Sequence, residues 1–167
     1  MARDAIEQYL YWMDEAFDGP DEHSLLNNLR SLHDRDWDAH PPGGQRRAWQ
    51  IVNHIGVCKF MYADHAFAQG ELTWETVDAA TGFGRSPAEI IGWLRRGHDL
   101  LRSCVAALGD DSELLVQRRA NWGEMKETRW LIRVMIEHDL YHGGEINHLR
   151  SVLQGTDRWA HEAWPDG

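Results

Sequence analysis

The chain has 167 residues, of which 43% are hydrophobic and 26% are charged, and its formal net charge is -10. This acidic balance argues against nucleic-acid binding, which needs a basic stripe to displace counterions, and it disfavours docking on anionic lipid. With two cysteines, no charged-then-apolar leader and no run near the roughly 18 apolar residues of a membrane span, we expect one cytoplasmic domain over residues 1–167.

The first half of the chain predicts two long helices. The first runs from about Asp4 to Phe17 and stops at Gly19-Pro20. A shorter apolar segment from Asp21 to Leu32 follows, and the Pro- and Gly-rich stretch 40–44 then breaks the chain. The second long helix is predicted from about Gln45 to Ala68. Its apolar stripe carries Ile51, His54, Cys58 and Met61.

A long connection and a third helix come next. Residues 70–85 lack a strong period and are predicted to form a long connection. The run Ser86-Pro87-Ala88-Glu89 combines an N-cap, a first-turn proline and a glutamate at the third helical position, which predicts a helix that continues to Gly109. The segment from Asp110 to Gly123 is predicted to be irregular.

The last helix is predicted to be the longest. It begins between Glu124 and Thr128 and reaches Leu153, with Gly155 as its stop. Convincing period-two strands are absent from the sequence. The expected fold is therefore all-α, a four-helix bundle with long crossover connections.

Ionisable side chains interrupt the core-facing stripe of this last helix. The stripe advances in alternating steps of three and four residues, and its centre holds His138, His142 and Glu145 where a bundle needs apolar groups. Burying such groups without partners costs several kcal/mol, so a metal ion is predicted to compensate them. The full stripe is Leu131, Met135, His138, His142, Glu145, Leu149 and Val152.

Helix geometry limits which residues can share that ion. His138 and His142 lie about 6 Å apart along the axis, so both rings can reach one ion. His54, on the stripe of the second helix, is the favoured third ligand. His65 lies about 16 Å further along that helix, and His148 about 15 Å from His138 on another face. Three histidines from two facing helices would leave positions open for water or substrate.

At these residues the chain resembles the DinB-like (DinB/YfiT) family of bacterial metal-binding bundles. The resemblance rests on Asn53-His54-Ile55, on the run from His138 to Ile146 and on Leu149-Arg150, and it covers nearly the whole chain. One histidine of the second helix and an HxxxH pair of the last bind a divalent metal in that family, which implies His54, His138 and His142 here. Zinc and nickel both occur, and three imidazoles do not discriminate strongly between them.

The resemblance also implies a class of function. Relatives with assigned activities are transferases or isomerases that use low-molecular-weight thiols, with a metal-bound thiolate or water as the reactive group. The isomerases usually carry a further C-terminal domain, so a thiol-dependent S-transferase acting on a small molecule is expected, and a homodimer is implied. Glu145 and Tyr141 are candidates for an acid, a base or an orienting residue. The family often has Arg-Gly-Gln where this chain has Gly143-Gly144-Glu145, which leaves the role of Glu145 open.

Two other functions compete with the transferase. In the first, the protein is a non-catalytic stress-response protein whose metal stabilises the bundle. In the second, it is a zinc metalloprotease-like hydrolase, because His138, His142 and His148 match the spacing of HExxHxxGxxH. Asp139 would then replace the catalytic glutamate with a shorter base, and Glu145 stands where that motif needs a helix-breaking glycine.

The remaining polar candidates are predicted to have structural or surface roles. Cys58 is expected to be a buried small hydrophobe. Glu137 and Asp139 are expected to flank the site or face solvent. Surface positions are predicted for His23, His33, His40, His98 and His161, and solvated or ion-paired roles for Arg46, Arg47 and Arg150.

Overall fold

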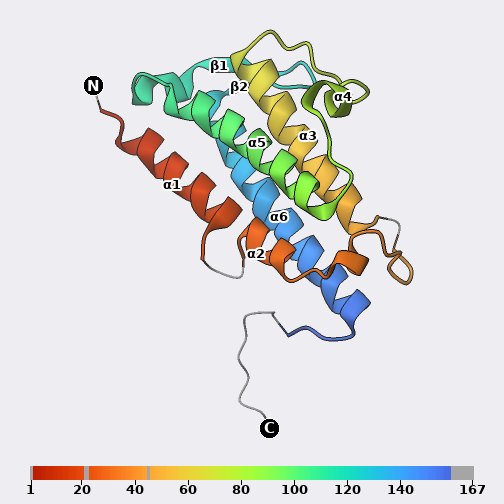
Figure 1. Ribbon diagram of the computed structural model, residues 1–167. Coiled ribbons are helices and arrows are strands. Elements are labelled where there is room, and N and C mark those ends of the chain that lie inside the picture. Colours follow the sequence, from red (N-terminus) through yellow and green to blue (C-terminus); the bar gives the residue numbers. More distant parts are fainter. Residues whose placement is uncertain (1, 21–22, 45, 159–167) are drawn as a thin grey trace.

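Four long helices lie alongside one another in the computed structural model, which describes residues 2–20, 23–44 and 46–158 (Figure 1). Helix α1 packs against α5 and α6, and α3 packs against the same two helices, so the four form a closed ring around the core. The predicted all-α bundle is therefore confirmed. The four helices are α1 (Asp4–Asp18), α3 (Ala48–Phe67), α5 (Pro87–Ala106) and α6 (Thr128–Gln154).

The directions of the helices explain the long connections. Figure 1 shows α3 and α5 running one way and α1 and α6 running the other. The chain between α3 and α5 must therefore return along the bundle, and residues 68–86 do so, with the short helix α4 (Val77–Thr81) on the way. The connection from α1 to α3 holds α2 (Leu25–Arg30) and the 3-10 turn η1 (Asp34–Asp36).

The connection from α5 to α6 corrects one expectation. It contains a 3-10 turn, η2 (Asp111–Leu115), and an antiparallel hairpin of β1 (Gln117–Arg119) and β2 (Met125–Glu127). The prediction that residues 110–123 are irregular is wrong over η2 and β1, and β2 occupies residues where the last helix was expected to begin. Each strand has only three residues, which is too short for a period of two to stand out.

The predicted helix ends agree closely with the structure. Ser86 and Glu89 form the expected capping box at the start of α5. Gly155 ends α6 in the left-handed conformation, with a φ of 69°. The predicted starts at Asp21 and Gln45, and the tail from 159 to 167 with His161, lie outside the described residues.

The buried face of α6 differs from the predicted stripe. It centres on Leu131, Met135, Asp139, His142 and Ile146, whereas Val152 is 41% exposed and both His138 and Glu145 are only half-buried. Helix α6 contacts α1, α2 and α3, so its buried arc is broader than one seam. His138 and Glu145 consequently lie at the border between core and solvent, where a side chain can meet both.

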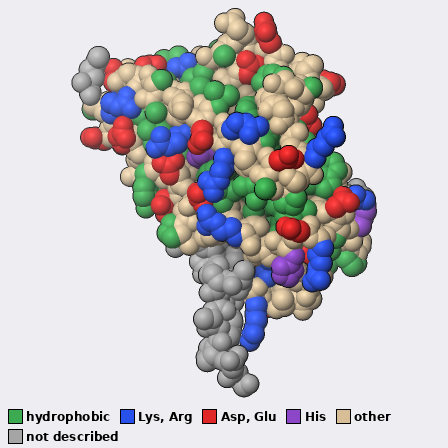
Figure 2. Space-filling view, viewed as in Figure 1, with side chains coloured by type: hydrophobic (Ala, Val, Ile, Leu, Met, Phe, Trp, Pro, Cys, Tyr) green, Lys and Arg blue, Asp and Glu red, His purple; other side chains and the backbone are tan. Residues whose placement is uncertain are grey.

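The surface mixes charges of both signs. On the face viewed in Figure 2, acidic and basic side chains are interspersed, and hydrophobic atoms reach the surface between them. Among the described helices, none combines the length and the apolar composition needed to cross a bilayer.

Close packing of α3 on α5 depends on a glycine. A methyl group at Gly56 would lie 2.1 Å from Cζ3 of Trp93, and that ring is fixed by a hydrogen bond from its Nε1 to Thr81. We expect Gly56→Ala to lower the free energy of unfolding by about 1–3 kcal/mol, because overpacking outweighs the gain in helix propensity. Gly92→Ala is the matched control on α5, where the nearest atom is 4.0 Å away. It should stabilise by up to about 1 kcal/mol. Equal effects of the two changes in urea denaturation would contradict this account.

Candidate metal centre

Three histidine side chains converge between α3 and α6. His54 comes from α3, and His138 and His142 come from successive turns of α6. One nitrogen of each ring lies within 4.8 Å of the other two. The structure therefore brings together all three residues that the sequence predicts as ligands.

His54 and His138 are in direct contact through their ring nitrogens. Their Nε2 atoms are 3.2 Å apart. Two lone pairs would therefore face each other unless one of the two Nε2 atoms is protonated or both bind the same cation. Nδ1 of His138 is buried and has no hydrogen-bond partner in the described part of the chain. Three nitrogen donors at this spacing suit a divalent transition-metal ion.

Burial keeps two of the three imidazoles, those of His138 and His54, in the neutral form. Burial lowers the pKa of His138 to about 3, and the neighbouring His142, His54 and Lys59 act in the same direction. Burial also lowers the pKa of His54, followed by the effects of His142 and Arg46. Neutral rings keep a lone pair available, so at neutral pH these two histidines need no deprotonation before they bind an ion.

A carboxylate orients the third ring. Nδ1 of His142 lies 2.6 Å from Oε2 of Glu145, and Nη2 of Arg46 donates to Oε1 of the same carboxylate at 2.6 Å. When Nδ1 carries the proton and donates it to Glu145, Nε2 of His142 presents its lone pair to the other rings. Such carboxylate–histidine pairs fix ring orientation and raise ligand basicity in metal sites. The sequence left the role of Glu145 open, and in the structure its carboxylate contacts both His142 and Arg46.

The contact between Glu145 and His142 predicts a measurable loss of affinity. We expect Glu145→Gln to weaken divalent-metal binding by about 10- to 100-fold, because the amide holds the His142 ring less firmly and supplies no charge. Competition with a chromophoric chelator would measure the change. Glu137→Gln is the matched control, since Glu137 is exposed on the same helix and pairs with Arg133. Unchanged affinity in Glu145→Gln would mean that Glu145 does not orient the ligand.

Aromatic rings surround the histidines on the solvent side. Trp74 stacks on His54 with ring centroids 6.0 Å apart and planes within 6°. Tyr141 lies edge-on to His142 at 5.0 Å and is 70% exposed. Both rings reach solvent, so this side of the cluster is accessible.

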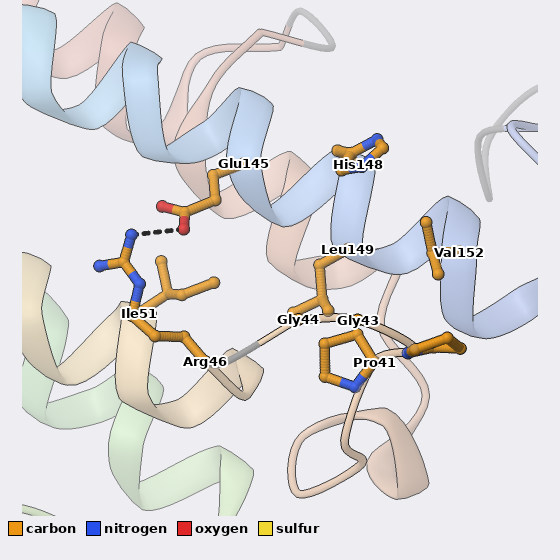
Figure 3. A pocket seen from close by; sticks show the side chains of 10 residues that line it. Pro41, Gly43, Gly44, Arg46, Ile51, Glu145, His148, Leu149 and Val152 are labelled. Atoms are coloured by element: carbon orange, nitrogen blue, oxygen red, sulfur yellow. Dashed lines mark hydrogen bonds and ion pairs between the residues drawn. The ribbon is translucent and has the colours of Figure 1, made fainter.

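A groove of about 470 Å³ opens beside the cluster (Figure 3). Glu145 belongs both to its wall and to the hydrogen bond with His142. Figure 3 shows Arg46 bonded to Glu145, with Ile51 beside this pair and Leu149 next to Pro41 of the preceding loop. His148 is exposed at the same groove. The groove thus has an apolar surface and a polar end beside the histidines.

Several sequence candidates lie apart from the ligand cluster. His65 bonds the carbonyl of Leu72 instead. Helix α6 continues without a break through Glu145, so the bend of the metalloprotease motif is absent. His148 is exposed at the edge of the groove and does not belong to the histidine cluster. Cys58 is buried as predicted, with Sγ 4.0 Å from Nε2 of His54, and burial raises the pKa of its thiol to about 12.

One buried polar cluster was not predicted from the sequence. Lys59 of α3 is 1% exposed and pairs with Asp139 at 2.6 Å, and its Nζ lies 3.5 Å from Nδ1 of His98. The surface position predicted for His98 is wrong, because the ring is 4% exposed and stacks on Phe17. Asp139 faces the core rather than solvent. The available signal was a lone lysine within the otherwise apolar run from Ile55 to Ala63.

The arginines have distinct roles. Arg150 is buried rather than solvated. Its guanidinium donates hydrogen bonds to Asn147 and to the carbonyls of residues 156–158, just beyond α6. Arg47 pairs with Asp38. Of the three arginines considered from the sequence, Arg46 is the one at the groove.

The fold is thus a helical bundle in which three imidazoles from two facing helices converge, and such a cluster has the donors to hold a divalent ion. The family model of the DinB superfamily matches residues 21–146, a range that includes all three histidines. The chain therefore belongs to the DinB superfamily, and the resemblance found in the sequence is confirmed. The comparison with curated proteins gives no significant match.

Proposed function

We propose that this protein is a divalent-metal-dependent enzyme that transfers a low-molecular-weight thiol to a small electrophile. The observation that carries the proposal is the convergence of His54, His138 and His142 beside an accessible groove. Three neutral protein ligands leave coordination positions for a substrate, as in catalytic rather than closed structural sites. Zinc or nickel is the metal proposed for these donors.

The chemistry proposed for the site is thiol activation. A divalent ion held by the three imidazoles would supply the positive charge that lowers the pKa of a coordinating thiol below neutrality. The side chains around the ion would orient its ligands and position the substrate. Glu145 holds the His142 ring, Arg46 and His148 offer hydrogen-bond donors at the groove for a polar part of the substrate, and Ile51 and Leu149 take its apolar part. Tyr141 is the proposed proton donor or acceptor nearest to solvent.

Metal analysis tests the ligand set. The purified wild-type protein is expected to hold about one divalent ion per chain, and His54→Ala and His142→Ala are each expected to lose it. Two matched controls should keep the ion. Cys58→Ala removes a thiol 4.0 Å from His54, and His148→Ala removes an exposed imidazole from the same helix as His142. Equal metal content in all five proteins would show the ligand assignment to be wrong.

Turnover assays separate the enzyme from the alternative function. The metal-loaded protein is expected to conjugate model electrophiles with at least one bacterial thiol, and His54→Ala is expected to be inactive. If the metal instead serves a non-catalytic stress-response protein by tying α3 to α6, loading should raise the melting temperature while every thiol gives the uncatalysed rate. We further propose a cytoplasmic homodimer, which light scattering of the purified protein would check.

A further inference from the structure

A second cavity, larger than the groove at the histidines, lies beside the start of α3. Its volume is about 690 Å³, within the range of small-molecule sites. Trp49 stands five residues before His54, which places it about 140° around the helix from the metal ligand. The cavity therefore opens on a different side of α3. Its lining residues from η1, α3, α4 and α5 include Trp37, Trp49, Asp78, Phe83 and Ile90.

The walls of this cavity are aromatic and held in place. Trp49 and Phe83 have ring centroids 6.3 Å apart, and Phe83 packs edge-on against the buried Trp93 at 4.9 Å. The backbone nitrogen of Trp49 donates to the carbonyl of Trp37 at 3.2 Å. Rings fixed in this way offer π-faces whose negative potential attracts a cation.

The charged groups at the cavity leave a negative balance. The carboxylate of Asp38 is neutralised by Arg47 at 2.5 Å. The Asp78 carboxylate accepts a hydrogen bond from the uncharged amide of Asn53 at 2.8 Å, and no ion pair joins it to a cation among the described residues.

The other two charged lining groups, Asp34 and Arg85, differ in their surroundings. No ion pair joins Asp34 to any residue that the structure describes. Arg85 contributes one positive charge to the lining, so the two carboxylates that are unpaired among the described residues still outnumber it. Two carboxylates, Asp34 and Asp78, thus face a space enclosed by indole and phenyl rings.

From the aromatic walls and this charge balance, we propose that the cavity is a binding site for an organic ammonium ion that carries an aromatic or branched apolar group. The apolar group would pack against Trp37 and Ile90, and the ammonium would lie between the Trp49 ring and the two carboxylates. The site is separate from the histidine cluster, and the proposal holds whether or not those histidines bind metal.

Isothermal titration calorimetry with three probes that share a phenyl ring tests the proposal. We expect 2-phenylethylammonium to bind about tenfold more tightly than 2-phenylethanol, with an affinity that falls as salt is added, and 3-phenylpropanoate to bind most weakly. No binding of the ammonium probe would overturn the proposal. Equal binding of 2-phenylethanol would also overturn it, because the apolar walls alone would then account for binding. Tighter binding of 3-phenylpropanoate would overturn it as well, because Arg85 would then attract the ligand.

Variants locate the probe. Asp34→Asn and Trp49→Leu are each expected to weaken binding of 2-phenylethylammonium by about 3- to 10-fold. Asp99→Asn and Trp122→Leu remove an exposed carboxylate and an exposed indole elsewhere, and binding should be unchanged in both. Circular dichroism would confirm that Trp49→Leu folds, and Asp34→Asn alters only an exposed side chain. Wild-type affinity in both cavity variants would show that the probe binds elsewhere and would overturn the proposal.

Discussion

Replacing Lys59 by methionine is expected to lower the free energy of unfolding by about 3–5 kcal/mol. The ammonium of Lys59 is enclosed by three groups: the Asp139 carboxylate at 2.6 Å, Nδ1 of His98 at 3.5 Å and the face of the Phe17 ring at 5.0 Å. Burial raises the pKa of Asp139, and the lysine counteracts that rise. Without Lys59, the Asp139 carboxylate would remain in the core with no positive partner, which is the costly outcome for a buried ion pair.

A double variant distinguishes a lost partner from lost packing. Lys59→Met with Asp139→Leu removes both charges, and we expect it to recover most of the stability that Lys59→Met loses. Recovery should fall short of complete, because Nδ1 of His98 also loses its donor. Urea denaturation of the wild type, both single variants and the double variant gives the coupling energy. Additive effects of the two single changes would mean that the pair is not coupled.

The histidine site was predictable because most of its geometry is local. The spacing of His138 and His142 places both rings on one side of any continuous helix, whatever surrounds it. His54 could be added because it interrupts an apolar stripe near the middle of another helix. Neither step required knowledge of how the four helices are arranged.

The cluster of Lys59, Asp139 and His98 depends on that arrangement. Its members come from α3, α6 and α5. Only Lys59 stands alone in an apolar stretch, whereas His98 and Asp139 have charged neighbours in the sequence that make an exposed position look natural. Periodicity shows which side of a helix is apolar but not which helix lies opposite. The same limit explains the error on α6, where the broad buried arc includes Asp139, which the predicted stripe leaves out.

Acidification is expected to destabilise the metal-free protein by about 3 kcal/mol between pH 6.5 and pH 5. Burial lowers the pKa of His98 to about 2 and that of His138 to about 3, with nearby positive charges acting in the same direction. The unfolded chain takes up protons on both rings near their ordinary pKa of 6.5, while the folded chain keeps them neutral. Their stabilisation is therefore fully present above pH 6.5 and is lost as the pH falls towards 3. The lowered pKa of His54 adds to the same trend.

The contribution of His98 can be isolated because it lies away from the histidine cluster. Its Nδ1 faces the Lys59 ammonium, so a proton on that ring would place two positive charges in contact within the core. We expect His98→Gln to reduce the loss of stability between pH 6.5 and pH 5 by about half, because one of the two strongly shifted rings is gone. Most carboxylates remain ionised above pH 5, so this window reports chiefly on histidine. Urea denaturation in the presence of a chelator, repeated at several pH values, would measure the slope. The same slope in His98→Gln as in the wild type would show that the buried neutral His98 is not a source of the acid sensitivity.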